Sequence, residues 1–490
     1  MSLDSDWWVR GGRVQALTKL KTSSLAMLGI LVLLVMEAFL LPLMSGDWDG
    51  VAYFVFPCLS IALIYFLFSL YLTSRFGPNL VGELGFIYIG IALIYTIVPA
   101  FNIANGLVEG DPITLLNPTN RMVLEQLWRH TLFVFGFVCG YPLIRGSQPL
   151  SNIEPKMNVR MESLAINFLL ILLLLSVTYL VLMSAPVETY YDAYSRYEHL
   201  SWGLGKIASI SIRFKSAIYA IVMTLMFLNY KRYRIALPLF ILIICGFELI
   251  FSFGARIQVF TILIQYLCLY TLVVKRIPLR DILLISAIFI PLFFLVEVVR
   301  LGVGIQGAGA AIDGISFQLP WEFNAVFYTG LHLYIERLGG SMPFVEWPMF
   351  FNDFISIFTF NDFLQWNPME WYYLNFYPNA PVAPYTLGPI ADSAIWGGEV
   401  DLFFRGIFNG LFFGLIARWF SSYKNRWWAL SIYVFCCGAS IITLKYSVFY
   451  ILTPLAKNML PVILMVVCFM KFISMNRIDL SASGKPTSFL

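Results

Sequence analysis

Residues 163–184 read SLAINFLLILLLLSVTYLVLMS, a stretch of 22 residues that contains no charged side chain. A helix needs about 20 predominantly apolar residues to cross the hydrocarbon core of a bilayer. The length and composition of this stretch therefore predict a transmembrane helix.

The rest of the chain has the same character. Of its 490 residues, 59% are hydrophobic and 12% are charged, and the mean hydropathy is +0.78. A soluble domain carries about 25% charged residues, so the composition excludes a soluble globular protein. The segments of about ten alternating residues that are typical of outer-membrane barrels are absent. An all-α polytopic membrane protein is therefore expected.

The apolar runs predict twelve transmembrane helices. They lie at residues 24–44, 51–73, 83–105, 131–145, 163–184, 216–230, 235–252, 256–274, 281–299, 401–420, 428–444 and 456–473. The fourth run is short, and its helix is expected to start before His130.

Basic residues indicate the orientation of these helices. They cluster at the N-terminus and then at every second connection: Arg75; Arg145, Lys156 and Arg160; Lys231, Arg232 and Arg234; Lys275, Arg276 and Arg280; Arg418, Lys424 and Arg426; Lys471, Arg477 and Lys485. Because basic loops stay in the cytoplasm, both termini are expected there. The acidic residues then lie mostly on the outer face.

Four regions follow from this topology. Residues 1–299 hold helices one to nine with outer loops at 106–130 and 185–215, residues 300–400 form a large periplasmic loop between helices nine and ten, residues 401–473 hold helices ten to twelve, and residues 474–490 form a cytoplasmic tail. Long loops without evident structure are usually functional, so we expect the active surface on the outer face.

The large loop is acidic and rich in aromatic residues. Between residues 301 and 400, Arg337 is the one basic residue among nine acidic ones. Its tryptophans and tyrosines, such as Trp347, Trp371 and Tyr372, suit a membrane–water interface. Flat aromatic rings also pack against sugars, and composition leaves both interpretations open.

One segment of this loop carries the first candidate catalytic groups. Residues 331–338 are expected to form a helix that ends at Gly339 and Gly340. His332 and Glu336 then share a face at i,i+4 spacing, with Arg337 next to them. They can act as a base, an orienting carboxylate and an anion-binding arginine. They can equally be a solvated polar stripe, with Arg337 near the negative end of the helix.

No metal site, cofactor or disulfide framework is predicted. The seven cysteines lie in apolar runs without C-x2-C spacing, and the three histidines lack H-x3-H spacing.

Several arginines are expected at the outer membrane face. Arg256 follows the tight turn Ser252–Ala255, and Arg300 and Arg405 lie at the outer ends of helices nine and ten. Arg196 lies with His199 in the 185–215 loop. These guanidinium groups can reach up to lipid headgroups. They can also form a phosphate site, because the planar guanidinium binds phosphate through two hydrogen bonds.

Short motifs give the chain a resemblance to a known family. They are the Gly254-Ala255-Arg256 turn that opens a helix, Pro384-Tyr385-Thr386-Leu387-Gly388-Pro389-Ile390, Gly397-Gly398-Glu399, and Arg405-Gly406 with Gly410 and Gly414. With the large late outer loop, they resemble the bacterial O-antigen or oligosaccharide repeat-unit polymerases of the Wzy type, which are related to the O-antigen ligases.

The resemblance implies a GT-C-like membrane glycosyltransferase in the bacterial inner membrane, without metal or cofactor. Such an enzyme transfers a growing glycan from undecaprenyl pyrophosphate onto the first sugar of another lipid-linked repeat unit. The implied partners are the lipid-linked donor and acceptor, the bilayer, a chain-length regulator and a flippase, with no nucleic acid.

Roles follow for the candidate residues. Arg256 and Arg337 are expected to bind pyrophosphate, supported by Arg196, Arg300 and Arg405. His332 or Glu336 is expected to be the base. His199, Asp392 and Glu399 are rival bases and otherwise bind substrate.

Two alternatives remain from the sequence. An O-antigen ligase would share the fold and the arginines. A flippase or transporter of lipid-linked oligosaccharide would show internal repeats and charges in mid-bilayer, for which Glu248 and Lys457 are the candidates.

Overall fold

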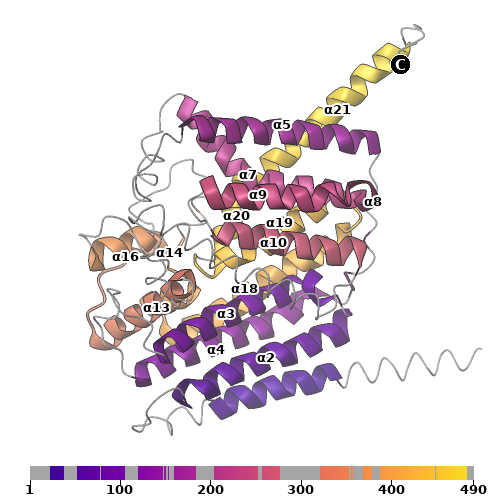
Figure 1. The fold of residues 1–490 in the computed structure, drawn as a ribbon. Helices are drawn as coiled ribbons and strands as arrows, with labels where there is room; N and C mark the ends of the chain where they lie inside the picture. The colour runs from indigo at the N-terminus through magenta and orange to yellow at the C-terminus, as the bar shows by residue number, and fades with distance from the viewer. Residues whose placement is uncertain are drawn as a thin grey trace, which may run out of the picture. The chain divides into compact units, whose positions relative to one another are not determined.

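A computed structural model of the chain contains only helices as regular elements among the residues that it describes (Figure 1). Those residues are 22–37, 52–77, 79–104, 120–146, 148–150, 153, 159–183, 204–251, 256–275, 321–351, 355, 357, 368–377, 387–446 and 448–482.

Six of these helices are long and apolar enough to cross a membrane. They are Val55–Phe76, Leu84–Ile103, Arg121–Arg145, Ile257–Val274, Gly398–Tyr423 and Leu452–Ile473. Shorter apolar helices lie at Thr22–Glu37, Met161–Leu174, Phe214–Leu228, Ala236–Glu248 and Trp427–Thr443. The predicted all-α multi-pass membrane protein is confirmed at this level. The predicted helix at 281–299 lies outside the described residues.

Three helix boundaries differ by nine residues or more from the prediction. Helix α7 (Leu204–Leu228) begins twelve residues before the predicted start at 216 and takes in the end of the predicted 185–215 loop. Helix α4 (Asn120–Arg145) begins eleven residues before the predicted start at 131 and takes in the end of the predicted 106–130 loop. Its polar residues Arg129 and His130 are both buried, so they continue the helix instead of ending it. Helix α21 (Leu460–Ala482) runs past the predicted end at 473.

The chain divides into two compact units. The first comprises residues 1–152, 313–422 and 439–451, and the second comprises residues 153–312, 423–438 and 452–490. Helix α19 (Trp427–Thr443) therefore contributes residues to both.

The first unit is built on a bundle of four helices. Helix α2 (Ala52–Phe76), helix α3 (Leu84–Ala104) and α4 pack against one another, and α4 also packs against α18 (Gly398–Tyr423). Glycines allow this last contact. A Cβ atom at Gly136 or Gly140 of α4 would collide with backbone atoms of α18, and one at Gly406 or Gly410 would collide with backbone atoms of α4. Small residues let membrane helices approach until their backbones touch.

A buried ion pair ties α4 to the start of α3. Nε and Nη2 of Arg145 donate hydrogen bonds to the two oxygens of Glu83 at 2.5 and 3.1 Å, and the Tyr141 hydroxyl donates another at 2.5 Å. All three side chains are buried. The two-pronged geometry is the strong form of an arginine–carboxylate pair.

The large predicted loop contains helices of its own. Helix α13 (Trp321–Gly339), helix α14 (Trp347–Phe350), helix α16 (Pro368–Phe376) and helix α17 (Pro389–Trp396) gather near the ends of α3 and α4 (Figure 1). They share a core that includes Leu333, Trp371 and Tyr372. Trp371 and Tyr372 therefore pack inside this assembly, whereas Trp347 is exposed and stacks on Trp396 at 5.4 Å.

The second unit has helix α5 (Val159–Met183), helix α7 (Leu204–Leu228), the short α8 (Tyr230–Tyr233), helix α9 (Ala236–Phe251) and helix α10 (Arg256–Leu269) side by side. A buried polar group links α7 to α9. Nζ of Lys215 lies 2.8 Å from Glu248, and the Tyr219 hydroxyl donates to the same carboxylate at 3.0 Å.

A glycine substitution tests the contact between α4 and α18. We expect Gly140→Ala to destabilise the protein by about 1–3 kcal/mol, because the new methyl group meets backbone atoms that cannot move aside alone. The measurement is the midpoint of thermal unfolding in detergent.

Gly246→Ala in α9 is the matched control, because nothing lies within 4 Å of its added Cβ atom. Its melting point should stay at or above that of the wild type, since alanine favours a helix. Equal melting points for both variants would contradict the backbone contact.

Candidate functional site

Helix α17 is the centre of the candidate site. Gly388 and Pro389 start it with the preferred chemistry of a helix N-terminus, an extended residue followed by proline. Gly388 has room for no side chain, because a Cβ atom would collide with the carbonyl oxygen of Leu444. Residues 389–395 are all buried, so the side chains that reach α17 meet it away from water.

Three arginines from three different helices converge on α17. Arg129 comes from α4, Arg337 from α13 and Arg405 from α18. We call these three residues the arginine cluster. All of them belong to the first unit.

Arg129 is fully buried and is held by neutral groups. Its Nη2 donates to the Ser393 hydroxyl at 2.8 Å and to the Ile390 carbonyl at 3.1 Å, and its Nη1 donates to Gln126 at 3.3 Å. Its guanidinium also lies 4.7 Å from the centre of the Tyr334 ring, at cation–π distance. Among the described residues, none forms an ion pair with Arg129 and none accepts a hydrogen bond from its Nε.

Arg337 lies at the carboxyl end of α17. Its Nη1 donates to the Ala394 carbonyl at 2.7 Å, where the helix dipole favours a cation. Gly398 lies beside its guanidinium with a φ of +67°, a conformation that favours glycine. The residue is otherwise exposed, so its remaining donors face outward.

Arg405 is paired with two carboxylates. Its Nη1 lies 2.8 Å from Asp392 and its Nε lies 2.6 Å from Asp401. Burial raises the pKa of Asp392, and the charge of Arg405 opposes that rise. Asp392 and Arg405 thus contact each other, and their predicted roles in substrate binding stay predictions.

His332 and Glu336 lie side by side on α13, as their spacing predicts. Nε2 of His332 is 3.5 Å from the Glu336 carboxylate, and Nδ1 is 2.6 Å from the Tyr372 hydroxyl of α16. Phe376 packs edge-on against the imidazole at 4.8 Å. Burial lowers the pKa of His332, and Glu336 opposes that shift. The imidazole is therefore kept neutral, and its position is fixed from both sides.

The predicted helix end is also confirmed. Helix α13 ends at Gly339, and Gly340 has a φ of +72°. The amide of Ser341 donates to the Glu336 carbonyl at 3.0 Å, which closes the helix in the manner of a Schellman motif.

Glu399 is exposed at the start of α18 and acts on its surroundings through charge. Burial raises the pKa of Tyr334, and the negative charges of Glu125 and Glu399 raise it further. Arg129 opposes this effect from beneath the ring. Tyr334 therefore stays a neutral hydrogen-bonding group between Arg129 and the two acidic residues.

The structure does not test the other predicted site residues. Arg256 is the first residue of α10 in the second unit, and the structure describes only its backbone. Arg196, His199 and Arg300 lie outside the described residues.

The sequence reasoning missed Arg129, Asp401 and Tyr372. A longer α4 would have included Arg129, and the i,i+4 spacing of Asp401 and Arg405 was readable. Tyr372 lies 40 residues from His332, and no local pattern joins them.

The assembled groups define a coherent chemistry. Arg337 offers guanidinium donors at the surface, and the buried Arg129 contacts the same helix α17 at Ile390 and Ser393. Glu336 directly precedes Arg337 on α13, and the His332–Glu336 pair can accept a proton. The arrangement suits an anionic substrate that carries a hydroxyl group to be deprotonated. Within the described ranges, no three His, Cys, Asp or Glu side chains converge as a metal site requires.

Comparison with known proteins adds no relative from which a function could be transferred. The chain matches no protein-family model, no curated protein and no solved structure.

Proposed function

We propose that the protein is a membrane glycosyltransferase that polymerises oligosaccharide repeat units carried on undecaprenyl pyrophosphate. It would act at the periplasmic face of a bacterial inner membrane, through a twelve-helix GT-C-like fold with both termini in the cytoplasm. The product would be an O-antigen, a capsule or an exopolysaccharide. No metal or cofactor takes part in this proposal.

One observation carries the proposal. Three arginines gather around α17, and the exposed Arg337 directly follows Glu336, whose carboxylate lies 3.5 Å from the buried His332. A polyprenyl pyrophosphate presents an anion at the membrane surface while its tail stays in the bilayer. Arginine matches that anion geometrically, and preorganised cations stabilise negative charge as it develops on a leaving group.

The proposed reaction exchanges one bond for another at the anomeric carbon of the donor sugar. The acceptor hydroxyl oxygen bonds to that carbon, and the bond from the carbon to the pyrophosphate oxygen breaks. The leaving pyrophosphate keeps the bonding electrons, and the arginines bind its charge. The hydroxyl proton passes to His332 or Glu336. The transition state has oxocarbenium character, as in other glycosyl transfers.

The arginines in the proposal differ in the observations that support them. Arg337 has donors free to face a ligand, whereas Arg405 already holds Asp392 and Asp401. Arg405 therefore helps to place α17. Arg256, Arg196 and Arg300 are proposed as further contacts to the pyrophosphate on the sequence pattern alone.

Partners follow from the same proposal. Donor and acceptor are both lipid-linked glycans, a flippase delivers them, and a chain-length regulator acts on the product.

The first test removes the exposed arginine. In a deletion strain that carries the gene on a plasmid, Arg337→Ala should lower polymer synthesis about a hundredfold, the scale of losing one preorganised donor. The readout is the ladder of surface glycan, with membrane levels of the protein measured alongside. Arg121→Ala is the matched control, because Arg121 is exposed on α4 and, among the described residues, its one ion pair is with Glu125.

The ladder also separates the proposed activity from its alternatives. Single repeat units on the lipid in the deletion strain support a polymerase. Long polymer that is not attached to its lipid would identify a ligase. Repeat units held in the cytoplasmic leaflet would identify a flippase. Full-length ladders with Arg337→Ala would contradict the site.

The second test concerns the identity of the base. Because burial lowers the pKa of His332, its imidazole stays neutral to below pH 6.5, and activity should fall only on the acid side of that value. Glu336→Gln removes the charge that opposes this shift, so the acid limb should move to still lower pH. The measurement is the pH profile of polymer formation in membrane vesicles.

Three results decide the roles of the pair. A shifted acid limb with activity retained identifies His332 as the base and Glu336 as a positioning residue. Loss of activity at every pH in Glu336→Gln, with the histidine present, identifies Glu336 as the base. Normal activity in both Glu336→Gln and His332→Gln would show that neither group is catalytic.

A further inference from the structure

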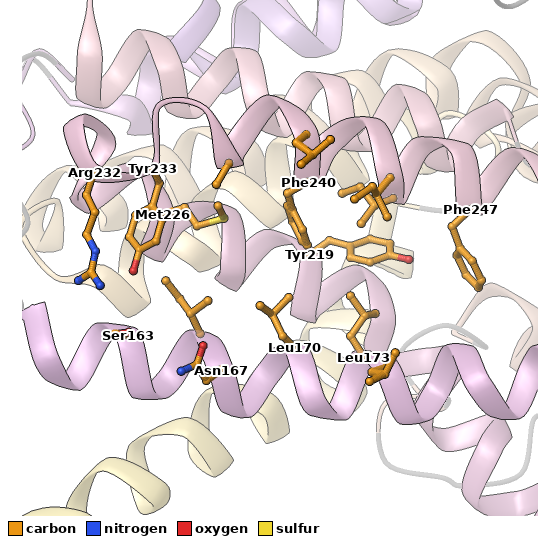
Figure 2. Close-up of a pocket in the computed structure, with 16 residues that line it drawn as sticks. Ser163, Asn167, Leu170, Leu173, Tyr219, Met226, Arg232, Tyr233, Phe240 and Phe247 are labelled. Atoms are coloured by element: carbon orange, nitrogen blue, oxygen red, sulfur yellow. The ribbon is translucent and has the colours of Figure 1, made fainter.

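A pocket of about 710 Å³ opens in the second unit, and its lining residues are different from those of the candidate site (Figure 2). Helices α5, α7, α8 and α9 all contribute to its wall. Most of its lining is aliphatic or aromatic, with Leu170 and Leu173 facing Phe240 and Phe247. An open apolar pocket in a membrane protein lies where lipid chains can enter.

The charged group of the pocket lies at one end. Arg232 and Tyr233 lie at that end with Ser163 and Asn167, whereas Leu173 and Phe247 lie at the other, where the Tyr219 hydroxyl donates to Glu248 (Figure 2). This change from a charged end to an apolar end matches a phospholipid, in which a charged headgroup is followed by an apolar chain.

Its length matches one leaflet. The lining runs from Ser163 to Leu174 on α5 and from Ala236 to Phe247 on α9. At a helical rise of about 1.5 Å per residue, each of these stretches is about 16 Å long. Half of a hydrocarbon core of about 30 Å is about 15 Å. The pocket is therefore as deep as a single lipid chain.

The apolar wall is open along its side. Leu174 is 65% exposed and Ile243 is 60% exposed, although both line the pocket. A chain can therefore enter laterally from the bilayer.

The polar end carries a positive charge. Lys231, Arg232 and Arg234 follow one another around α8, and all three are exposed. Arg232 lies over the ring of Tyr233, 5.3 Å from its centre, which orients the guanidinium. The nearby Glu162 is buried and accepts a hydrogen bond from Asn229, so it offsets only part of this charge. A basic segment next to membrane helices attracts anionic headgroups.

We propose that this pocket binds one chain of an anionic glycerophospholipid, with the headgroup phosphate on Arg232. Asn167 and Tyr233 donate to the headgroup, and Leu170, Phe240 and Ile243 contact the chain. With the orientation that the basic clusters predict, the lipid comes from the cytoplasmic leaflet. The site is independent of the proposed glycan chemistry.

The positive charge at the polar end favours an anionic lipid over a protein helix. A helix from a second copy would also cover Arg232 without supplying an anion.

Native mass spectrometry of the full chain in detergent tests the proposal. Phosphatidylglycerol, phosphatidylethanolamine and a polyprenyl phosphate are titrated separately. The wild type should retain phosphatidylglycerol in preference to the other two. Arg232→Gln and Ile243→Trp should each weaken that retention about fivefold or more, by removing the cation and by filling the pocket.

Each variant has a matched control on its own segment. Arg234→Gln removes a neighbouring cation that does not line the pocket, and Leu242→Trp adds the same bulk to an exposed α9 residue outside it. Arg234→Gln should bind phosphatidylglycerol more tightly than Arg232→Gln does, and Leu242→Trp should bind it more tightly than Ile243→Trp does.

Several outcomes would overturn the proposal. An equal loss of phosphatidylglycerol in a variant and in its matched control would show that the lipid is retained without a specific site. Equal retention of phosphatidylethanolamine would exclude headgroup recognition, and preference for the polyprenyl phosphate would assign the pocket to the lipid carrier. A change of oligomeric state in Ile243→Trp without loss of lipid would make this face a protein interface.

Discussion

The structure depends on one constraint: a polar side chain buried among membrane helices must find its partner inside the protein. Water is absent there, and each unsatisfied group costs several kcal/mol. The buried Glu37 accepts hydrogen bonds from Ser60 at 2.7 Å and from Thr131 at 2.9 Å, which links three helices through one carboxyl group. Such links fix which helices of the first unit lie together, beyond what apolar packing selects.

The glycine contact between α4 and α18 positions two arginines of the candidate site. Their contact brings two backbones together, and Arg405 directly precedes Gly406 in that contact. Arg129 lies two turns before Gly136 on α4. Both arginines therefore reach α17, and Asp392 and Ser393 on consecutive positions receive them. The close approach of the two helix backbones positions the arginines of the site.

The sequence predicted the helices better than the site. Transmembrane runs were readable because lipid imposes both length and composition. The start of α4 was expected before His130, but its position at Asn120 was not predicted, because Arg129 and His130 look like an exposed helix end until α13 and α17 cover them. Likewise, the i,i+4 rule placed His332 beside Glu336. The contact between His332 and Tyr372, however, joins residues 40 positions apart, and the contact between Arg129 and Ser393 joins residues 264 positions apart. Only the folded chain brings such residues together.

A comparison of the buried cations separates structural from functional charge. Arg145 pairs with Glu83 and Tyr141, and Lys215 pairs with Glu248 and Tyr219, so each unit contains a cation neutralised by a carboxylate beside a tyrosine hydroxyl. Arg405 is neutralised in the same way by two aspartates.

Arg129 differs from these three. Among the described residues, its partners are a hydroxyl, an amide and carbonyl groups, which orient the guanidinium but leave its charge in place. Arg145, Lys215 and Arg405 are each neutralised by a carboxylate, and an arginine held by neutral groups gains no comparable stabilisation. The positive charge of Arg129 strengthens the attraction of an anion to Arg337, which contacts the same helix α17, and that is the physical reason for proposing a phosphate site there.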